Sequence, residues 1–407
     1  MKTTIAFSNK VLIVTLLIFY IYAVNFNYIP LSGKMILGVM GILFISGISF
    51  PKPIWNYIFY PIFLVLWGGI ITILTGFFQF QYNVLLGFIN AVLASCFIYK
   101  ACKLDKCSLS EIFHFIVIAI FVESIISLLI KLSPSFYNLI SIFVDFHLEE
   151  VTSLEDYYRF VGLGSASFFG VMPSCALGLF SCVYLLLDET DKMRKLFYYI
   201  AIFVISIVSI LTARFCFVLV LLAFLYYIKC KGVRHIFITS TLLIFGFYAF
   251  FTYLLPMVMS DAMADWFYDA FENDSGSMIE SGSGQSWMGM LERSKMELFT
   301  FLFGDGAYTA ADGIHYYKRI DIGYIRQLLY YGIVGLVVNL IYQYRLGKFS
   351  TNIIKEKKFS YFIYGMYLSY LIMLVKGDIS IADYFILIAV ICYYKKNKFF
   401  KIKLYDS

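Results

Sequence analysis

Arg214 stands between two apolar runs of the chain, Lys195–Thr212 and Phe215–Ile228. A guanidinium group is costly to hold in or beside lipid, so an arginine at this depth is expected to bind an anion. The group presents its donors in a planar fork that fits two oxygens of a phosphate. The alternative is a side chain that only extends along the apolar surface to the water interface. We predict that Arg214 binds phosphate at a membrane face.

Other polar residues that can bind or catalyse lie close to the ends of apolar runs. They are Arg159, Arg293, His315, Asp321 and Arg326, with Lys376, Asp378 and Asp383 beside a later turn. Arginines bind phosphate oxygens, and an aspartate or a histidine can take a proton from an attacking hydroxyl group. The arginines of this set suit a ligand that carries phosphate groups.

The same residues have structural interpretations. Arg159 and Arg293 can pair with acidic residues of their loops. Arg326 can pair with Asp321 or Glu297. Asp321 can cap the helix that follows it, because negative charge is stabilising at a helix N-terminus. His315 can be a plain loop residue, and Lys376 with Asp378 can mark a tight turn.

Aromatic residues accompany these polar groups. They are Trp266, Tyr268, Trp287, Tyr308, Tyr316 and Tyr317. Sugar faces lie against aromatic rings and sugar hydroxyl groups bind carboxylates, so a carbohydrate is a fitting ligand. Tyrosine and tryptophan are also enriched at membrane interfaces, which is the structural alternative.

The elements that must position these groups are membrane helices. The chain has 407 residues, of which 61% are hydrophobic and 14% charged, a composition that excludes a soluble globular protein. Apolar runs recur at about the 20 residues that a spanning helix needs. We count twelve, at 11–30, 35–50, 54–77, 84–100, 112–131, 163–187, 196–213, 215–229, 235–255, 323–343, 360–376 and 379–394. The prediction is an all-α polytopic membrane protein with about twelve spans.

Basic residues set the orientation. With the N-terminus inside and alternating runs, 22 of the 32 basic residues fall on the inner side. Excess lysine and arginine marks cytoplasmic loops, so both termini are expected in the cytoplasm. The basic residues form no single stripe, so the net charge of +6 does not indicate a nucleic-acid partner.

The runs and loops divide the chain into five parts. Five spans occupy 1–131, a long outer loop 132–162, four spans 163–255, a large outer loop 256–322, and three spans with a basic tail 323–407. In the large loop, 258–271 and 287–303 have helical patterns, and 273–286 is rich in Ser and Gly and is expected to be flexible. A turn, Gly304-Asp305-Gly306, follows the second pattern.

Motifs for cofactors are missing from the sequence. No glycine-rich nucleotide-binding motif occurs, and Cys102 and Cys107 have no matching pair at zinc-site spacing. The eight cysteines avoid both long outer loops, so disulfides are not expected. We predict chemistry without a metal or cofactor.

Spacing within the loops follows a pattern. Ten residues separate Arg159 from Gly170, and ten separate Arg293 from Gly304. Segment 303–306 reads Phe-Gly-Asp-Gly, and Thr212-Ala213-Arg214 closes an apolar run. In these segments the chain resembles the bacterial O-antigen polymerases of the Wzy type, whose loops carry an arginine, ten residues and a glycine.

A further segment resembles the O-antigen ligases more distantly. Asp321 is followed by Gly332-Ile333-Val334-Gly335 at the spacing of a ligase signature that begins with histidine. Polymerases commonly lack that histidine, so the aspartate favours a polymerase over a ligase. The same departure leaves the base open between Asp321 and His315.

The resemblance implies a metal-independent glycosyltransferase of GT-C-like fold in a bacterial inner membrane. Its donor and acceptor would be glycans on undecaprenyl diphosphate, joined into O-antigen or capsule on the outer face, with a chain-length regulator as partner. Arg214 would hold the donor diphosphate with Arg159, Arg293 would hold the second lipid or order the loop, and Arg326 is a further candidate. Asp321 would act on the acceptor hydroxyl.

Three other classes of protein remain as alternatives. A ligase would pass the glycan to another acceptor. A flippase or other transporter usually has ionisable groups near the bilayer midplane, where these runs are nearly free of charge. A structural membrane protein would not need the arginines.

Overall fold

The computed structural model describes residues 7–43, 51–77, 79–146, 161–164, 171–232, 246, 248, 252–253, 282–310 and 315–405. Helices and their connecting turns make up these residues, and no named strand occurs among them. The all-α prediction is therefore confirmed for the described chain.

Two compact units divide the chain, and each joins segments that are distant in the sequence. Unit 1 comprises Met1–Asn9, Lys34–Ser108 and Trp287–Ser407. Unit 2 comprises Lys10–Gly33 and Leu109–Ser286.

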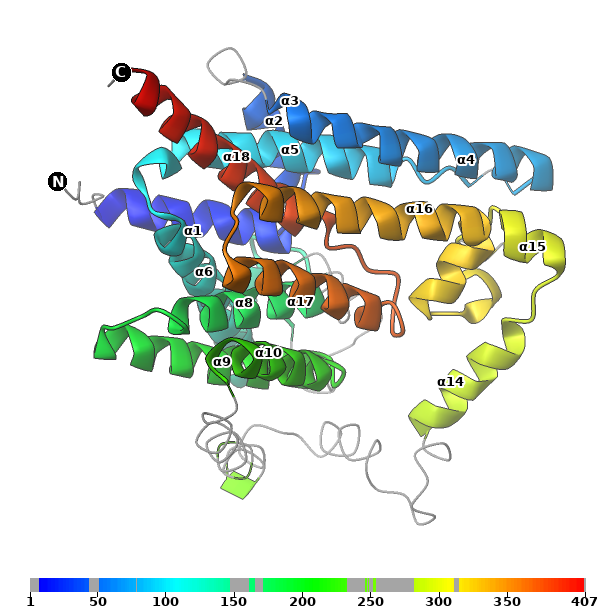
Figure 1. Cartoon of the computed structure of the whole chain (residues 1–407). Coiled ribbons are helices and arrows are strands. Elements are labelled where there is room, and N and C mark those ends of the chain that lie inside the picture. Colours follow the sequence, from blue (N-terminus) through cyan, green and yellow to red (C-terminus); the bar gives the residue numbers. More distant parts are fainter. Residues whose placement is uncertain are drawn as a thin grey trace. The chain divides into compact units, whose positions relative to one another are not determined.

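The helices of unit 1 surround α16, which runs over Gly323–Ile353. It packs against α4 (Phe59–Thr75), α15 (Leu298–Phe303), α17 (Lys357–Met373) and α18 (Ala382–Tyr405), and α18 packs against α5 (Asn83–Ala101) (Figure 1). The smaller elements are α2 (Gly33–Leu43), α3 (Lys52–Trp55), η2 (Asn56–Ile58), η3 (Leu104–Lys106), α14 (Gly282–Arg293) and η7 (Tyr317–Arg319).

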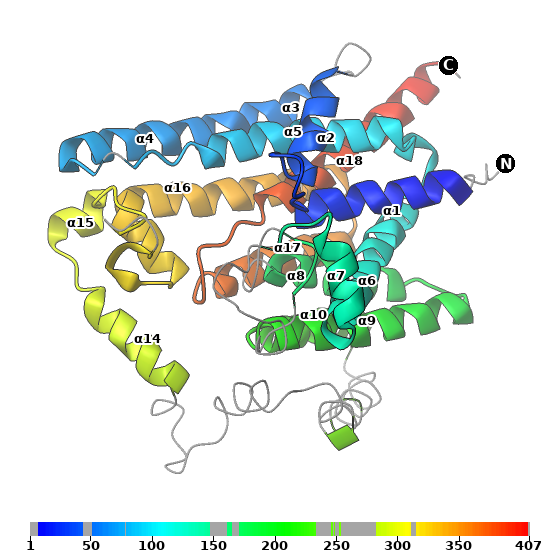
Figure 2. The same cartoon turned by 180° about the vertical axis from the view of Figure 1, so that it is seen from behind.

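In unit 2 the central helix is α8, Val171–Leu186, which is buried along nearly its whole length. It packs against α6 (Leu109–Leu132), α9 (Lys192–Thr212) and α10 (Cys216–Lys231) (Figure 2). The other helices are α1 (Phe7–Tyr22) and α7 (Pro134–Ser141).

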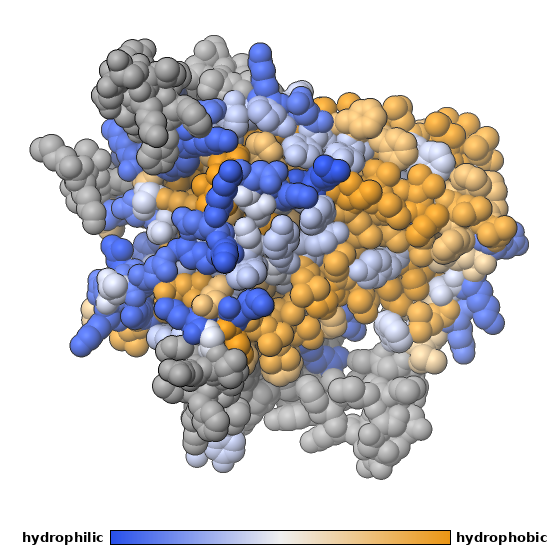
Figure 3. Space-filling view, viewed as in Figure 1, coloured by the Kyte–Doolittle hydropathy of each residue, from blue (hydrophilic) through white to orange (hydrophobic). Residues whose placement is uncertain are grey.

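Five of the described helices are long and apolar enough to cross a membrane. They are Lys52–Thr75, Asn83–Ala101, Leu109–Leu132, Lys192–Thr212 and Gly323–Ile353. Shorter apolar helices cover Phe7–Tyr22, Gly33–Leu43 and Val171–Leu186. On α4, Leu66, Ile70 and Leu74 share one face and are 62%, 54% and 73% exposed, which suits contact with lipid. A broad hydrophobic surface covers the right-hand side of the view in Figure 3. These features are those of a membrane protein.

α16 is interrupted at Gly332, where φ is 66° and ψ is −174°. This region of backbone conformation is essentially restricted to glycine. The interruption frees backbone carbonyl groups, and two neighbours satisfy them: Asp305 N donates to the Leu329 carbonyl at 2.6 Å, and Trp67 Nε1 donates to the Tyr331 carbonyl at 2.8 Å. The kink therefore ties α16 to α4 and to the turn after α15.

The large loop differs in part from its prediction. The pattern at 287–303 forms two helices, α14 and α15, and not one. Residues 282–286, expected to be flexible, form the start of α14. Downstream apolar residues explain the difference, because Trp287, Met290 and Leu291 pack against the cluster of Ile320, Ile322 and Leu329 and anchor the helix. The pattern at 258–271 lies outside the described residues.

Candidate functional site

The sequence-predicted residues of unit 2 lie at a helix–helix turn. Arg214 is half-buried between α9 and α10, and its carbonyl accepts a hydrogen bond from Phe217 N at 3.1 Å. The turn arises because α9 ends at Thr212 and Ala213 adopts an extended conformation. Arg159 and Gly170 lie outside the described residues.

In unit 1 the structure brings Arg326 and Asp321 together. An Arg326 Nη1 nitrogen lies 3.8 Å from Asp321 Oδ1. The guanidinium carbon lies 4.2 Å from the ring centre of Tyr308 and 3.6 Å from that of Tyr316. Such stacking on aromatic faces is favourable for a cation. Arg326 is only 7% exposed, so this group is a fixed part of the fold.

Asp321 is not the N-cap of α16, because Ile322 holds that position. Its backbone N–H lies 3.3 Å from Met290 Sδ, and its carboxylate faces Arg326. The ion pair with Arg326 corresponds to one of the structural interpretations considered for both residues.

Arg293 holds the loop that precedes α16. Its Nε donates to the Lys318 carbonyl at 3.2 Å and its Nη2 to the Arg319 carbonyl at 3.4 Å. Both acceptor residues have left-handed backbone conformations, with φ near 54° and 53°. These bonds favour the loop-ordering role for Arg293. His315 is exposed, and its carbonyl accepts a hydrogen bond from Ala310 N at 2.8 Å.

Gly304 ends α15 with a φ of 89°. A Cβ atom at this position would lie 2.6 Å from the Tyr330 carbonyl oxygen and 2.7 Å from Gly332 N. The turn therefore needs glycine for its conformation and for the close approach to the kink of α16. Gly304 therefore has a structural role beside the kink, and its predicted role in substrate binding stays a prediction.

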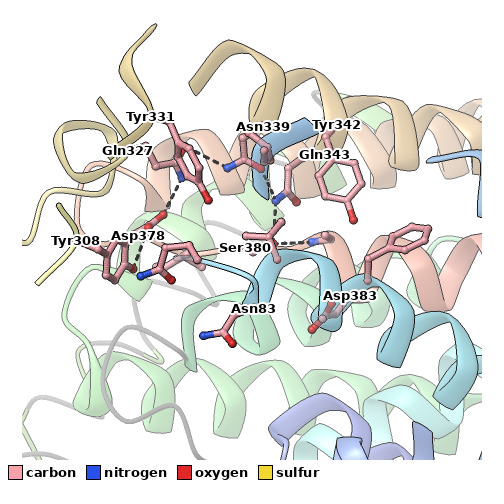
Figure 4. A pocket seen from close by; sticks show the side chains of 17 residues that line it. Asn83, Tyr308, Gln327, Tyr331, Asn339, Tyr342, Gln343, Asp378, Ser380 and Asp383 are labelled. Carbon is pink, nitrogen blue, oxygen red and sulfur yellow. Dashed lines mark hydrogen bonds between the residues drawn. The ribbon is translucent and has the colours of Figure 1, made fainter. Parts of the chain in front are cut away.

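A cavity of about 350 Å³ lies among α4, α5, α16, the loop before η7 and the turn before α18. Carboxamide, carboxyl, hydroxyl and aromatic groups line it together with apolar side chains (Figure 4). Its polar and aromatic lining comprises Gln81, Asn83, Phe88, Tyr308, Gln327, Tyr331, Asn339, Tyr342, Gln343, Asp378, Ser380 and Asp383.

Hydrogen bonds connect the polar lining residues in a chain. The Tyr308 hydroxyl donates to Asp378 Oδ2 at 3.0 Å, and Gln327 Nε2 donates to Asp378 Oδ1 at 2.7 Å. Asn339 Nδ2 donates to Gln327 Oε1 at 3.1 Å, and Gln343 Nε2 donates to Ser380 Oγ at 2.8 Å. Three of these residues, at 327, 339 and 343, come from α16.

Gln79 fixes Tyr308 at the edge of this cavity. Its Oε1 accepts hydrogen bonds from the backbone N–H groups of Tyr308 and Thr309 at 2.7 and 2.9 Å, and its Nε2 donates to the Thr309 carbonyl. The ring of Tyr308 then contacts Arg326, and its hydroxyl reaches Asp378. One tyrosine thus links the predicted arginine to the cavity.

Asp378 is a half-buried carboxyl group of the cavity. Burial raises its pKa above the ordinary value of 3.8, whereas the Gln327 hydrogen bond, the Arg326 charge and the Tyr308 hydrogen bond oppose the rise. Burial and the nearby Asp378 charge raise the pKa of Tyr308, which therefore stays a hydrogen-bond donor. A carboxylate with a raised pKa is a better proton acceptor near neutral pH.

Sequence reasoning noted Asp378 and Asp383 but missed the carboxamides. The sequence does contain an indication of them, because Gln327, Asn339 and Gln343 fall within one largely apolar stretch that forms α16. It also missed Glu123 of unit 2, a buried residue of α6 that accepts hydrogen bonds from Ser127 Oγ at 3.0 Å and Leu163 N at 3.2 Å. Buried polar groups inside an apolar run are the feature to search for.

This arrangement can bind a hydroxyl-rich ligand and accept a proton from it. Carboxamides and a carboxylate bind hydroxyl groups, and the tyrosines offer ring faces. Within the described residues, no group of three His, Cys, Asp or Glu side chains is placed to hold a metal ion. No protein-family model matches the chain, and no curated protein matches it.

Proposed function

We propose that this protein joins oligosaccharide repeat units carried on undecaprenyl diphosphate, as a polymerase of the Wzy type in a bacterial inner membrane. The observation that carries the proposal is the cavity of unit 1, which combines carboxamides, tyrosine rings and the half-buried carboxyl group of Asp378. The proposal includes about twelve spans in a GT-C-like arrangement with both termini in the cytoplasm.

Part of the cavity lining lies in segments that the charge pattern assigns to the outer face, and Asn339 and Gln343 extend the lining along the predicted span 323–343. Gln81 and Asn83 precede or begin α5, Gln327 lies in the first turns of α16, and Asp378 and Ser380 lie between α17 and α18. An outer position is where a polymer of lipid-linked sugars is assembled. The size of the cavity falls at the lower end of the roughly 300–1,000 Å³ of small-molecule sites, which suits one or two sugar rings.

In the proposed reaction Asp378 is the base. An acceptor hydroxyl oxygen bonds to the anomeric carbon of the donor, the bond from this carbon to the diphosphate oxygen breaks, and the electron pair leaves with lipid diphosphate. The hydroxyl proton passes to the Asp378 carboxylate. Gln327 and Tyr308 hold this carboxylate in place through both of its oxygens. Asp321, which is paired with Arg326, orients the loop instead of taking the proton.

Arginine side chains bind the lipid diphosphate leaving group in this proposal. Arg214 binds the donor diphosphate with Arg159, since bidentate donors neutralise the charge that grows on it. Arg293 orders the loop before α16, and Arg326 holds Tyr308 against the cavity. A chain-length regulator and the membrane lipid are the further proposed partners.

The test is polymerisation in vitro. Purified protein is supplied with one defined lipid-linked repeat unit, and the products are separated by length. We expect a ladder from the wild type. Asp378→Asn and Arg214→Ala should each lower the rate at least about 10²-fold, close to 3 kcal/mol in the barrier, because one loses the base and the other a phosphate contact. Arg214→Lys should also fail, because it lacks the fork.

A strain that lacks the protein separates the alternatives. Surface glycan of a single repeat unit indicates a lost polymerase and supports the proposal. Accumulated lipid-linked polymer would indicate a ligase, and repeat units retained inside the cell would indicate a flippase. Polymer of normal length made by Asp378→Asn protein at wild-type rate would contradict the role of the base.

A further inference from the structure

Charge within the cavity of unit 1 has one sign. Among the described residues that line it, the charged ones are Asp378 and Asp383, and none is a lysine, an arginine or a histidine. Asp383 is paired with the ammonium group of Lys34. Asp378 is half-buried and is held by two neutral donors, Tyr308 and Gln327. The charge of Arg326, whose guanidinium stacks on the Tyr308 ring outside the lining, offsets part of the charge of Asp378. An ionised Asp378 therefore makes the interior of the cavity negative.

From this charge distribution we propose that the cavity is the acceptor subsite, that it takes a sugar without negative charge, and that it rejects acidic sugars. This inference rests on the proposed function and names the substrate class of that site. The neutral sugar is a hexose or an N-acetylated hexosamine. The rejected class comprises uronic acids and other sugars that carry a carboxylate or a phosphate.

Hydrogen-bonding capacity in the lining fits a neutral ligand. The carboxamide of Asn83 makes no hydrogen bond to any residue that the structure describes. It offers two donors and one acceptor, which match the hydroxyl and acetamido groups of a sugar. Asn83 and Gly87 lie one turn apart on α5 and both line the cavity, so this face of the helix is the wall that a sugar contacts.

Repulsion supplies the selectivity. Two like charges about 4 Å apart at a partly buried site repel strongly enough to weaken binding by at least roughly 10²-fold. No lysine, arginine or histidine stands among the described lining residues to pair with the carboxylate of an acidic sugar, and Arg326, outside the lining, already pairs with Asp321 and acts on Asp378. Acidic sugars should therefore bind at least about 10²-fold more weakly than neutral ones.

Gly87 provides a way to block the cavity without disturbing the fold. A Cβ atom at Gly87 would meet nothing within 4 Å, so Gly87→Trp places an indole in open space. Leu86 is the next residue of the same helix, is 50% exposed and does not line the cavity. Leu86→Trp is the matched control.

The experiment measures binding of methyl glycosides to purified protein by saturation-transfer NMR near neutral pH. The probes are neutral hexosides, N-acetylhexosaminides and hexuronides. Wild-type protein and the Leu86→Trp control should bind neutral hexosides or N-acetylhexosaminides, and Gly87→Trp should bind none of the probes. Hexuronides should bind to the wild type at least about 10²-fold more weakly than the neutral glycosides. Asp378→Asn should reduce this discrimination, because it removes the repelling charge.

Hexuronides that bind wild-type protein as well as neutral glycosides would overturn the inference, as would binding that survives Gly87→Trp. Failure of this inference differs from failure of the proposed function. Selective, Gly87-dependent binding without polymerisation of any repeat unit would keep the sugar site and reject the polymerase. Polymerisation with unselective binding would keep the polymerase and reject the neutral-sugar subsite.

Discussion

At the scale of residues, a half-buried carboxyl group accepts hydrogen bonds from two neutral donors. Asp378 receives hydrogen bonds from Tyr308 and Gln327, and burial is the largest influence on its pKa. Desolvation disfavours the charged form, so the folded protein holds the proton more tightly than the unfolded chain does. Activity and stability should therefore respond to pH in opposite directions.

The pH dependence of stability tests this argument. The folded-state pKa of Asp378 is raised above 3.8, so its contribution to stability is full below that pH. As the pH rises through the folded-state value, the unfolded chain has already released its proton and the contribution is lost. The apparent melting temperature of the wild type should fall relative to Asp378→Asn from about pH 4 upward.

Thermal unfolding of both purified proteins across this pH range provides the measurement. The polymerisation rate of the wild type should rise through the same window, since the base must be deprotonated. Melting curves of the two proteins that shift in parallel with pH would show that Asp378 does not titrate at a raised pKa.

At the scale of elements, the kink in α16 positions half of the cavity. Gln327 precedes Gly332 on this helix, and Asn339 and Gln343 follow it. A Cβ atom at Gly332 would collide with the backbone of Leu302 and Phe303 at the end of α15. The close contact of the two backbones fixes where the segments before and after the kink lie.

Substitution of Gly332 at the kink should strongly lower the stability of the fold. Gly332→Ala places a side chain in a conformation reserved for glycine and against neighbouring backbone, so we expect a loss of about 3 kcal/mol or more. Gly76→Ala is the control, because Gly76 has a φ of 79° but open space around its Cβ position. The control should cost only about 1–2 kcal/mol. Equal losses in thermal or denaturant unfolding would refute the contact argument.

The helices of this site were predictable, and their mutual placement was not. Apolar runs predicted α4, α5 and α16 because twenty or so apolar residues suffice for a spanning helix. The pair of Arg326 and Asp321 follows from their proximity in the chain. The contact of Gln79 with the backbone of Tyr308 and Thr309 joins segments more than two hundred residues apart, and no local pattern encodes it.

At the scale of the whole molecule, charge in unit 1 is arranged along its helices. α5, α16 and α18 each have residues that line the cavity near their first turns. Each of these helices ends in or leads to basic residues: Lys103 and Lys106 after α5, Lys355 after α16, and Lys395 and Lys396 within α18. Lys395 Nζ donates to the Asp105 carbonyl at 3.3 Å, so the basic ends of α5 and α18 meet. Asn83, Asp378 and Asp383 thus lie far along the chain from those basic residues, at the start of α5 and around the start of α18, whereas Asn339 and Gln343 extend the lining into the middle of α16.

This polarity predicts how the protein sits in the membrane. Basic ends face the cytoplasm, so the cavity should open toward the outer side.

Two cysteine variants report the two sides of the membrane. They are Tyr82→Cys, at an exposed position beside the cavity, and Lys103→Cys, at the basic end of α5. Seven of the eight native cysteines are buried, so Cys230→Ser gives a suitable background. A membrane-impermeant maleimide should label position 82 in intact spheroplasts and position 103 only after permeabilisation. The reverse labelling would turn the cavity toward the cytoplasm, and a reaction on the outer face would then be impossible at this site.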